Sequence, residues 1–170
     1  MNDLEQAFDN GYRKYLSREF MRISQANIPF FALKGNIRFK PKQMPDRILV
    51  SFHQNLCFEL KRVQTDSLPL ANIKPHQIAF LSEFQQKAGQ SYFIFAFMAS
   101  QKVFLVPITL FCKLIRTSEG ALIVNTTGRK SLHIKDLQKL DVKEIPMEVM
   151  QKHFRLNLEG FLEETIMSFL

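Results

Sequence analysis

The segment 45–61 limits the possible folds more than any other part of the chain. Two runs rich in β-branched and aromatic residues, 47–52 and 56–63, flank a short polar interruption. This pattern predicts an antiparallel hairpin. Glu59 and Lys61 are two residues apart in the second run, so they project from one face of the predicted strand.

The register of the hairpin decides whether Asp46, before the first strand, lies near Glu59. Any turn with an even number of residues keeps both on one face, because opposed residues in a ladder share a face. A turn centred on Phe52–His53 places Asp46 directly opposite Glu59, with Cβ atoms about 5 Å apart. A turn centred on Gln54–Asn55 separates them by about 13 Å along the strand. Asn favours turns more than Phe does, so the residues alone leave both registers open.

The residue types at Asp46, Glu59 and Lys61 favour phosphodiester chemistry. Mg²⁺ binds one or two carboxylates together with waters and phosphate oxygens, and it lowers the pKa of a bound water. A neighbouring Lys can orient the nucleophile or stabilise developing negative charge. The alternative is that Asp46 caps a turn while Glu59 and Lys61 form a solvated face, since short motifs also match by accident.

Two further polar residues lie where they can join this site. Glu5 falls at the edge of the apolar stripe of an N-terminal helix, and Gln77 shares the apolar stripe of a later helix, which is unusual for a long amide. The alternatives are a first-turn Glu that favours the helix dipole and an amide hydrogen-bonded at the edge of the core.

Composition indicates one compact domain over residues 1–170, because 46% of the residues are hydrophobic and 17 are Phe. Lys and Arg outnumber Asp and Glu by 23 to 16, and a net charge of +7 favours a polyanionic partner. A solvated basic loop without a partner is the alternative. The candidate DNA-phosphate contacts are Lys34, Arg38, Lys40, Lys42, Arg47 and Arg62.

The chain shows no sign of export or of membrane insertion. Asp3, Glu5 and Asp9 occupy the place of a signal peptide's basic and apolar regions, and no apolar run reaches membrane-spanning length. Cys57 and Cys112 provide neither zinc-ligand spacing nor a disulfide framework. A cytoplasmic protein is expected.

Periodicity predicts a mixed sheet flanked by helices. Helices are expected over 3–26, 72–87 and 109–116, strands over 29–38, 91–98, 103–107 and 120–125 beside the hairpin, and an amphipathic helical tail over 146–170. The nearly continuous apolar character of 91–98 and 103–107 predicts burial on both faces. The tail is expected to pack on its own domain or against a second copy.

The ordered set of Glu5, Pro45-Asp46 and Glu59-x-Lys61 resembles the PD-(D/E)XK nuclease superfamily, and within it the RecU-type Holliday junction resolvases. Phe58-Glu59-Leu60-Lys61 resembles the catalytic strand of that family. Leu68-Pro69-Leu70 and His76-Gln77-Ile78 then follow in the family's order, and the similarity extends over about residues 1–116.

The resemblance implies a restriction-endonuclease-like α/β fold, the Phe52–His53 register, and a role for each matching residue. Asp46 and Glu59 would be ligands of Mg²⁺, with Mn²⁺ as a substitute, and Lys61 would lie near the attacking water. Glu5 would be an auxiliary acid, and Gln77 would orient the metal-site region. The implied partner is DNA, and the implied assembly is a homodimer that cuts four-way junctions.

Two departures from the family pattern accompany the resemblance. The segment from Lys34 to Asp46 is too short for the long stalk insertion of RecU-type proteins, and Cys57 stands where an acid is expected two residues before Glu59. The expected function is a metal-dependent, structure-selective DNA endonuclease that resolves Holliday junctions in recombination and repair. The alternatives are a restriction- or repair-type nuclease acting on duplex DNA, and an inactive DNA-binding module.

Overall fold

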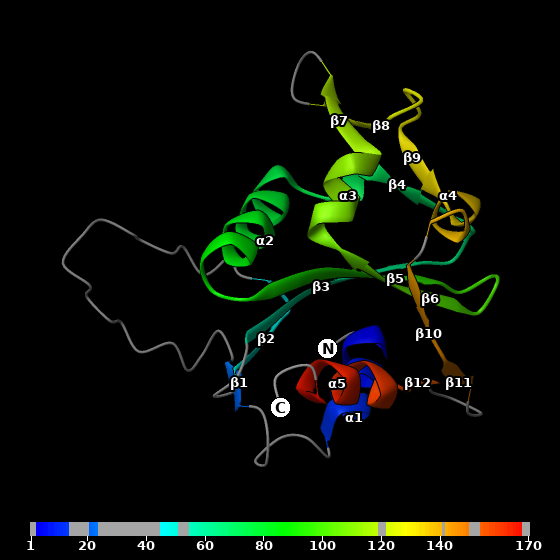
Figure 1. Ribbon diagram of the computed structural model, residues 1–170. Coiled ribbons are helices and arrows are strands. Elements are labelled where there is room, and N and C mark those ends of the chain that lie inside the picture. The colour runs from blue at the N-terminus through cyan, green and yellow to red at the C-terminus, as the bar shows by residue number, and fades with distance from the viewer. Residues whose placement is uncertain are drawn as a thin grey trace.

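The computed structural model describes residues 3–13, 21–23, 45–50, 55–118, 122–140, 142–149 and 154–167. In chain order the elements are α1 (Asp3–Tyr12), β1 (Met21–Ile23), β2 (Arg47–Val50), β3 (Asn55–Val63), β4 (Ser67–Pro69), the 3₁₀ turn η4 (Leu70–Asn72), α2 (Pro75–Lys87), β5 (Gln90–Phe97), β6 (Lys102–Pro107), α3 (Ile108–Leu114), β7 (Ile115–Ser118), β8 (Leu122–Asn125), β9 (Ser131–His133), α4 (Ile134–Gln138), β10 (Lys143–Ile145), β11 (Met147–Val149), β12 (Phe154–Leu156) and α5 (Glu159–Met167). Helices cover both faces of a central sheet (Figure 1). The predicted mixed sheet flanked by helices is confirmed.

The central sheet contains six strands in the order β1-β2-β3-β5-β6-β10. Every neighbouring pair is antiparallel except β3 and β5, which are parallel. Parallel neighbours need a crossover connection, and this one contains α2. The helix packs against both β3 and β5, so the crossover places α2 over the strand that contains Glu59.

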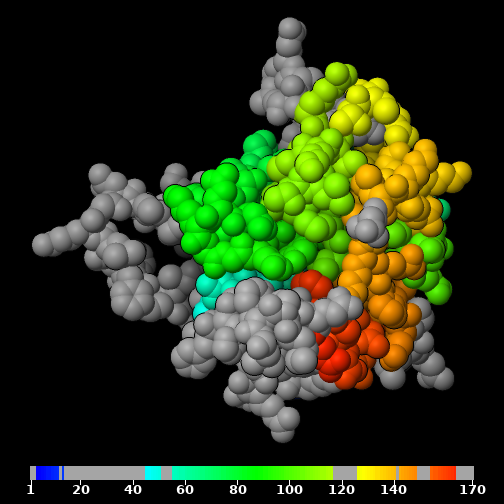
Figure 2. Space-filling view, viewed as in Figure 1, coloured from blue at the N-terminus to red at the C-terminus, as the bar shows by residue number. Residues whose placement is uncertain are grey.

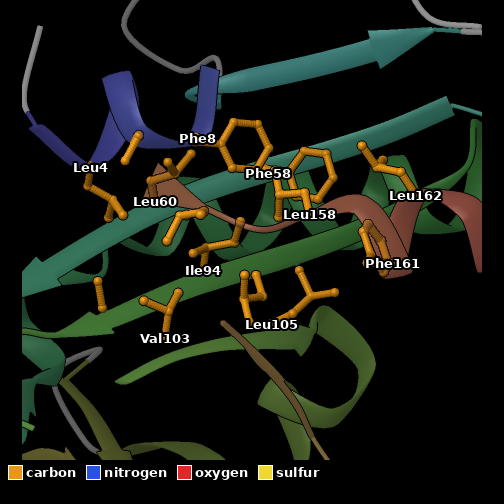
Figure 3. Packing of buried hydrophobic residues seen from close by; sticks show 14 of the residues in the cluster. Leu4, Phe8, Phe58, Leu60, Ile94, Val103, Leu105, Leu158, Phe161 and Leu162 are labelled. Atoms are coloured by element: carbon orange, nitrogen blue, oxygen red, sulfur yellow. The ribbon is translucent and has the colours of Figure 1, made fainter. Parts of the chain in front are cut away.

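One half of the core lies between the sheet and the layer formed by α1, β12 and α5 (Figure 3). Phe58 of β3 is at its centre: its ring centroid lies 4.9 Å from that of Phe8 and 6.3 Å from that of Phe161. Tilted and edge-on pairs of this kind are the favoured aromatic geometries. β3 therefore packs against both the first helix, α1, and the last helix, α5.

The other half of the core lies between the sheet and the α2–α3 layer. The two helices of this layer pack against each other, and their surfaces adjoin in Figure 2. Phe93 and Phe95 of β5 point into this layer, and the ring of Phe93 lies 4.6 Å from that of Phe111 on α3. Ile94 and Ala96 point into the opposite half. The predicted burial of this strand on both faces is confirmed.

The helix expected over 3–26 is wrong in its last part, because Met21–Ile23 forms β1. β1 pairs with residues 48–50 of β2. It is therefore the hydrogen-bonding neighbour of β2 on the side away from β3. Tertiary pairing of this kind outweighs local propensity. The strand expected over 29–38 lies outside the described residues.

The sequence predicted a helical tail from Pro146 onward. This prediction is wrong for the first part of the tail, because β11 and β12 precede α5. Phe154 and Leu156 are buried while Arg155 is exposed, which is the alternation of a strand. The segment packs on α1, and Leu158, at the start of the last helix, joins the core beside Phe58 (Figure 3). The tail thus contributes to the core of its own chain.

Candidate active site

The β2–β3 register brings Asp46 and Glu59 together. Arg47 pairs with Phe58 and Ile48 with Cys57, so one further step places Asp46 opposite Glu59. This is the register of a turn centred on Phe52–His53, although residues 51–54 themselves are outside the described part. The backbone N–H of Leu60 donates to Asp46 Oδ2 at 2.7 Å, which holds the Asp46 carboxylate against β3.

Glu59 is the most deeply buried acid of the site, with 2% of the residue exposed. Lys61 Nζ donates to Glu59 Oε1 at 2.8 Å, and Gln77 Nε2 donates to the same oxygen. The other end of the Gln77 amide, Oε1, accepts the backbone N–H of Lys74 at 2.9 Å. Gln77 therefore belongs to the N-terminal cap of α2 and touches the acid at the same time.

The start of α2 explains why Gln77 reaches the site. The helix begins at Pro75, not at Asn72 as expected, because Pro is well suited to the first helical position. Two hydrogen bonds join Lys74 and Gln77: the Lys74 backbone N–H donates to Gln77 Oε1, and the Gln77 backbone N–H donates to the Lys74 carbonyl oxygen at 2.9 Å. The cap sets the direction of the Gln77 side chain, and the crossover places it above Glu59.

Burial makes the two carboxylates difficult to ionise together. The pKa of Glu59 is raised from 4.5 to about 7 by desolvation and then by the nearby Asp46, although Lys61 opposes this shift. The pKa of Asp46 is also raised by desolvation, with a smaller contribution from Glu5, while the Leu60 N–H and Lys61 act in the opposite direction. Neighbouring like charges in a desolvated site disfavour the ionised carboxylates. An additional positive charge would therefore stabilise the ionised pair.

This donor set fits a hard divalent cation. Both groups offer carboxylate oxygens, and Mg²⁺ is commonly bound by one or two carboxylates, with waters and phosphate oxygens as its remaining ligands. A cation would favour the ionised forms of both carboxylates, which burial and the neighbouring acids disfavour. Within the described part of the chain, no group of three or more His, Cys, Asp or Glu side chains is arranged to hold a metal.

Cys57 occupies the same face of β3, one alternation before Glu59, and it is completely buried. Desolvation, followed by the charges of Glu59 and Asp46, raises the pKa of its thiol. The Cys57 side chain is therefore a neutral thiol at physiological pH. The family resemblance implies an acid at this position.

Glu5 lies near the site but is held by Arg47. Its Oε2 is 3.3 Å from Arg47 Nη2, and its charge contributes to the raised pKa of Asp46. Asp9, one helical turn further along α1, makes a closer pair with the same guanidinium, at 2.6 Å from Nε. The sequence analysis missed this pair. The only available signal was that Glu5 and Asp9 are four residues apart and share one face of a helix.

Arg47, one of the expected DNA contacts, is buried on the α1 side of the sheet. Only 5% of Arg47 is exposed, and its guanidinium is engaged by Asp9 and Glu5 beneath α1. Arg62 lies on the same side of the sheet, where it pairs with Asp3 at 3.0 Å and stacks over the Phe154 ring. The remaining candidates, Lys34, Arg38, Lys40 and Lys42, lie outside the described residues.

The fold and the site have the arrangement implied by the resemblance to PD-(D/E)XK nucleases: a mixed sheet that brings an Asp and a Glu together beside a Lys. The sequence model of one family, Recombination protein U, matches residues 2–159. The chain belongs to this RecU family.

Other comparisons add a distant structural likeness. A solved structure of Hjc, a Holliday junction resolvase from the archaeal hyperthermophile Archaeoglobus fulgidus, is similar over 81% of this chain and 98% of that chain, with a TM-score of 0.44 and 12% sequence identity. No curated protein sequence matches the chain. In the described part, no helix has the length and apolar character needed to cross a membrane.

Proposed function

We propose that this protein is a metal-dependent DNA endonuclease that cuts four-way junctions during recombination and repair. Membership of the RecU family supports a nuclease that acts on recombination intermediates. The single observation that carries the proposal is the convergence of Asp46, Lys61 and Gln77 on the buried carboxylate of Glu59, from two strands and a helix.

Each side chain has a role that follows from its contacts. Asp46 and Glu59 would hold Mg²⁺ or Mn²⁺, and the cation would supply a more acidic water and neutralise charge on the scissile phosphate. Lys61, which donates to Glu59 at 2.8 Å, would hold its ammonium group near the attacking water and the phosphate. Gln77 restrains Glu59, and Glu5 would be an auxiliary acid at the edge nearest Asp46.

The DNA is expected to approach from the α2 side of the sheet. Asp46, Glu59 and Lys61 project towards α2, whereas Arg47 and Arg62 project towards α1. We therefore propose no DNA contact for either arginine. A homodimer, as the family resemblance implies, would present two such sites to the two symmetric strands of a junction.

The decisive experiment compares three substrates with and without Mg²⁺: a synthetic four-way junction, a linear duplex of the same sequence, and supercoiled plasmid. Cleavage confined to the junction and dependent on the metal supports the proposal. Equal cleavage of the linear duplex favours a restriction- or repair-type nuclease. Binding without cleavage in both Mg²⁺ and Mn²⁺ contradicts any nuclease function.

The neutral thiol of Cys57 favours a second candidate, a DNA-binding module that has lost its nuclease activity, because one acid of the expected set is missing. Cys57→Asp separates the two candidates. If the wild-type protein binds junctions without cutting them and Cys57→Asp cuts, the missing acid accounts for the inactivity. A wild-type protein that cuts rejects this candidate.

A further inference from the structure

A buried arginine lies directly behind the proposed metal site. Arg47 is the first residue of β2, and its side chain projects to the face opposite that of Asp46. Its Nε and Nη2 donate to the two carboxylate oxygens of Asp9 at 2.6 and 3.0 Å. Paired contacts of this kind use the planar fork of a guanidinium and define its orientation. The fork is therefore anchored on α1.

The same guanidinium reaches the site in two further directions. Arg47 Nη1 donates to the backbone carbonyl of Asp46 at 2.6 Å, and Nη2 lies 3.3 Å from Glu5 Oε2. Asp46 is consequently held at both ends, since its carboxylate accepts the Leu60 N–H on the other face of the sheet. One anchored cation thus links the main chain of one proposed metal ligand to the carboxylate of the auxiliary acid.

We propose that Arg47, anchored by Asp9, is a positioning residue that holds Asp46 and Glu5 in the geometry required for cleavage. This inference rests on the proposed nuclease function. It assigns an indirect role in cleavage to Asp9, which is not one of the proposed site residues. The division of contacts supports the proposal: Asp9 takes the two shorter bonds, while Glu5 makes the longer one and keeps more of its side chain exposed, 25% against 16%.

Geometry explains why the effect on cleavage should be large. Displacing a catalytic group by about 1 Å can cost on the order of a hundredfold in rate. Without Asp9, the Arg47 fork loses the partner that defines its orientation, and the carbonyl of Asp46 loses a fixed donor. We expect Asp9→Asn to lower the single-turnover cleavage rate on the order of ten- to a hundredfold, while the junction dissociation constant without metal changes less than about twofold.

The Leu60 amide reports the position of Asp46 directly and needs neither metal nor DNA. A backbone N–H that donates to a carboxylate at 2.7 Å forms a strong, charge-assisted bond, so its proton resonance lies downfield. In nuclear magnetic resonance spectra of the metal-free protein, Asp9→Asn should move the Leu60 amide proton towards the value seen in Asp46→Asn, which lacks the charged acceptor.

Asp3→Asn is the matched control. Asp3 also joins α1 to the sheet through an arginine, with its Oδ2 3.0 Å from Arg62 Nη1, but neither of these two described residues is hydrogen-bonded to Asp46. It should leave the Leu60 resonance and the cleavage rate unchanged. If Asp9→Asn does not fold, Arg47→Lys replaces it: the charge is kept, but one ammonium group cannot reproduce the fork, and the same changes are expected.

Two results would overturn the inference. One is a folded Asp9→Asn or Arg47→Lys protein with the wild-type Leu60 resonance. The other is an Arg47→Lys protein with weaker junction binding, a changed salt dependence and an unchanged rate at saturating DNA, which would make Arg47 a phosphate contact. If the wild-type protein cuts no DNA, the proposed function fails, while the Leu60 resonance still decides whether Asp9 and Arg47 hold Asp46 in place.

Discussion

Two charged clusters lie back to back across the sheet where β2 begins, and they differ in how their charges are compensated. On the α1 side, the guanidinium of Arg47 is bonded to Asp9 and Glu5. On the α2 side, Asp46 and Glu59 share Lys61 and have raised pKa values. An arginine cannot lose its charge, whereas a carboxylate can take up a proton.

The difference indicates which cluster holds the structure together and which is ready to bind. A bonded guanidinium beneath a helix needs nothing further, and removing one partner leaves a buried charge. Both clusters contain two carboxylates and one cation, but on the α2 side desolvation raises the pKa values of both carboxylates, and an added cation would offset this cost. Clusters of titratable groups with perturbed pKa values mark functional sites, and the raised pKa values of Asp46 and Glu59 lie on the α2 side.

The largest effect should come from neutralising the acids on the α2 side. Asp46→Asn or Glu59→Gln should lower the single-turnover cleavage rate on the order of a hundred- to a thousandfold, because each removes a charged group that acts on the transition state. Binding of the junction without metal should persist or tighten, since negative charge is lost. Glu83→Gln, which removes an exposed acid paired with Lys87 on α2, is the control. A near wild-type rate in either site variant would refute the assignment.

The second prediction uses the raised pKa of Glu59, about 7 against an ordinary value of 4.5. Between these pH values the metal-free folded state retains a proton that the unfolded state releases. The contribution of Glu59 to the free energy of unfolding should therefore be highest below about pH 4.5 and fall by up to about 3 kcal/mol as the pH rises through 7. Urea titrations from pH 5 to 8 measure this decline.

Glu59→Gln provides the comparison for that pH dependence. The variant cannot ionise at this position, so most of the decline should disappear. Mg²⁺ should raise the unfolding temperature of the wild-type protein more at pH 8 than at pH 6, because binding requires the ionised form. Equal slopes in wild type and variant would mean that Glu59 does not titrate in this range.

The third prediction disturbs the α1 side through the backbone. A Cβ added at Gly11 would collide with the backbone carbonyl oxygen of Leu156, whereas one at Gly160 would have nothing within 4 Å. Gly11→Ala should destabilise the fold by about 1–3 kcal/mol by forcing α1 away from β12. Gly160→Ala should stabilise it by up to about 0.5 kcal/mol, because Ala is preferred to Gly in a helix but Gly160 lies only in the first turn of α5. Chemical denaturation that shifts both variants in the same direction would contradict this packing.

The sequence predicted the α2 side of the site better than the α1 side. The alternation along β3 placed Glu59 and Lys61 on one face, and the unusual amide at Gln77 indicated a polar target. The register needed more, because the residues alone allowed two turns. The observed pairing of Arg47 with Phe58 agrees with the register that the family resemblance implied.

The sequence did not predict the ion pairs of Arg47 on the α1 side, and the reason is physical. A basic residue beside a basic segment is usually solvated, and nothing local shows that Arg47 is buried. Its partners Glu5 and Asp9 lie 42 and 38 residues away in the sequence, so only the packing of α1 on β2 brings them together. The prediction for the tail was wrong for a similar reason. The spacing of its apolar residues fits a helix, but pairing between β11 and β12 determines the structure of its first part.

The smallest effect separates the two roles of Gln77, which caps α2 through Oε1 and restrains Glu59 through Nε2. Gln77→Ala should cost about 1 kcal/mol of stability through the lost cap and about tenfold in cleavage rate through the released Glu59. Gln77→Glu keeps an acceptor for the Lys74 N–H but sets a third carboxyl group against Glu59 in place of a donor, so the helix cap should be kept while cleavage still falls, and the protein should lose stability as the pH rises. Gln86→Ala, at an exposed position of the same helix, should change neither. A normal cleavage rate in Gln77→Glu would reduce Gln77 to a helix cap, and the α2 side would then lose one of the contacts that distinguish it from the structural cluster behind it.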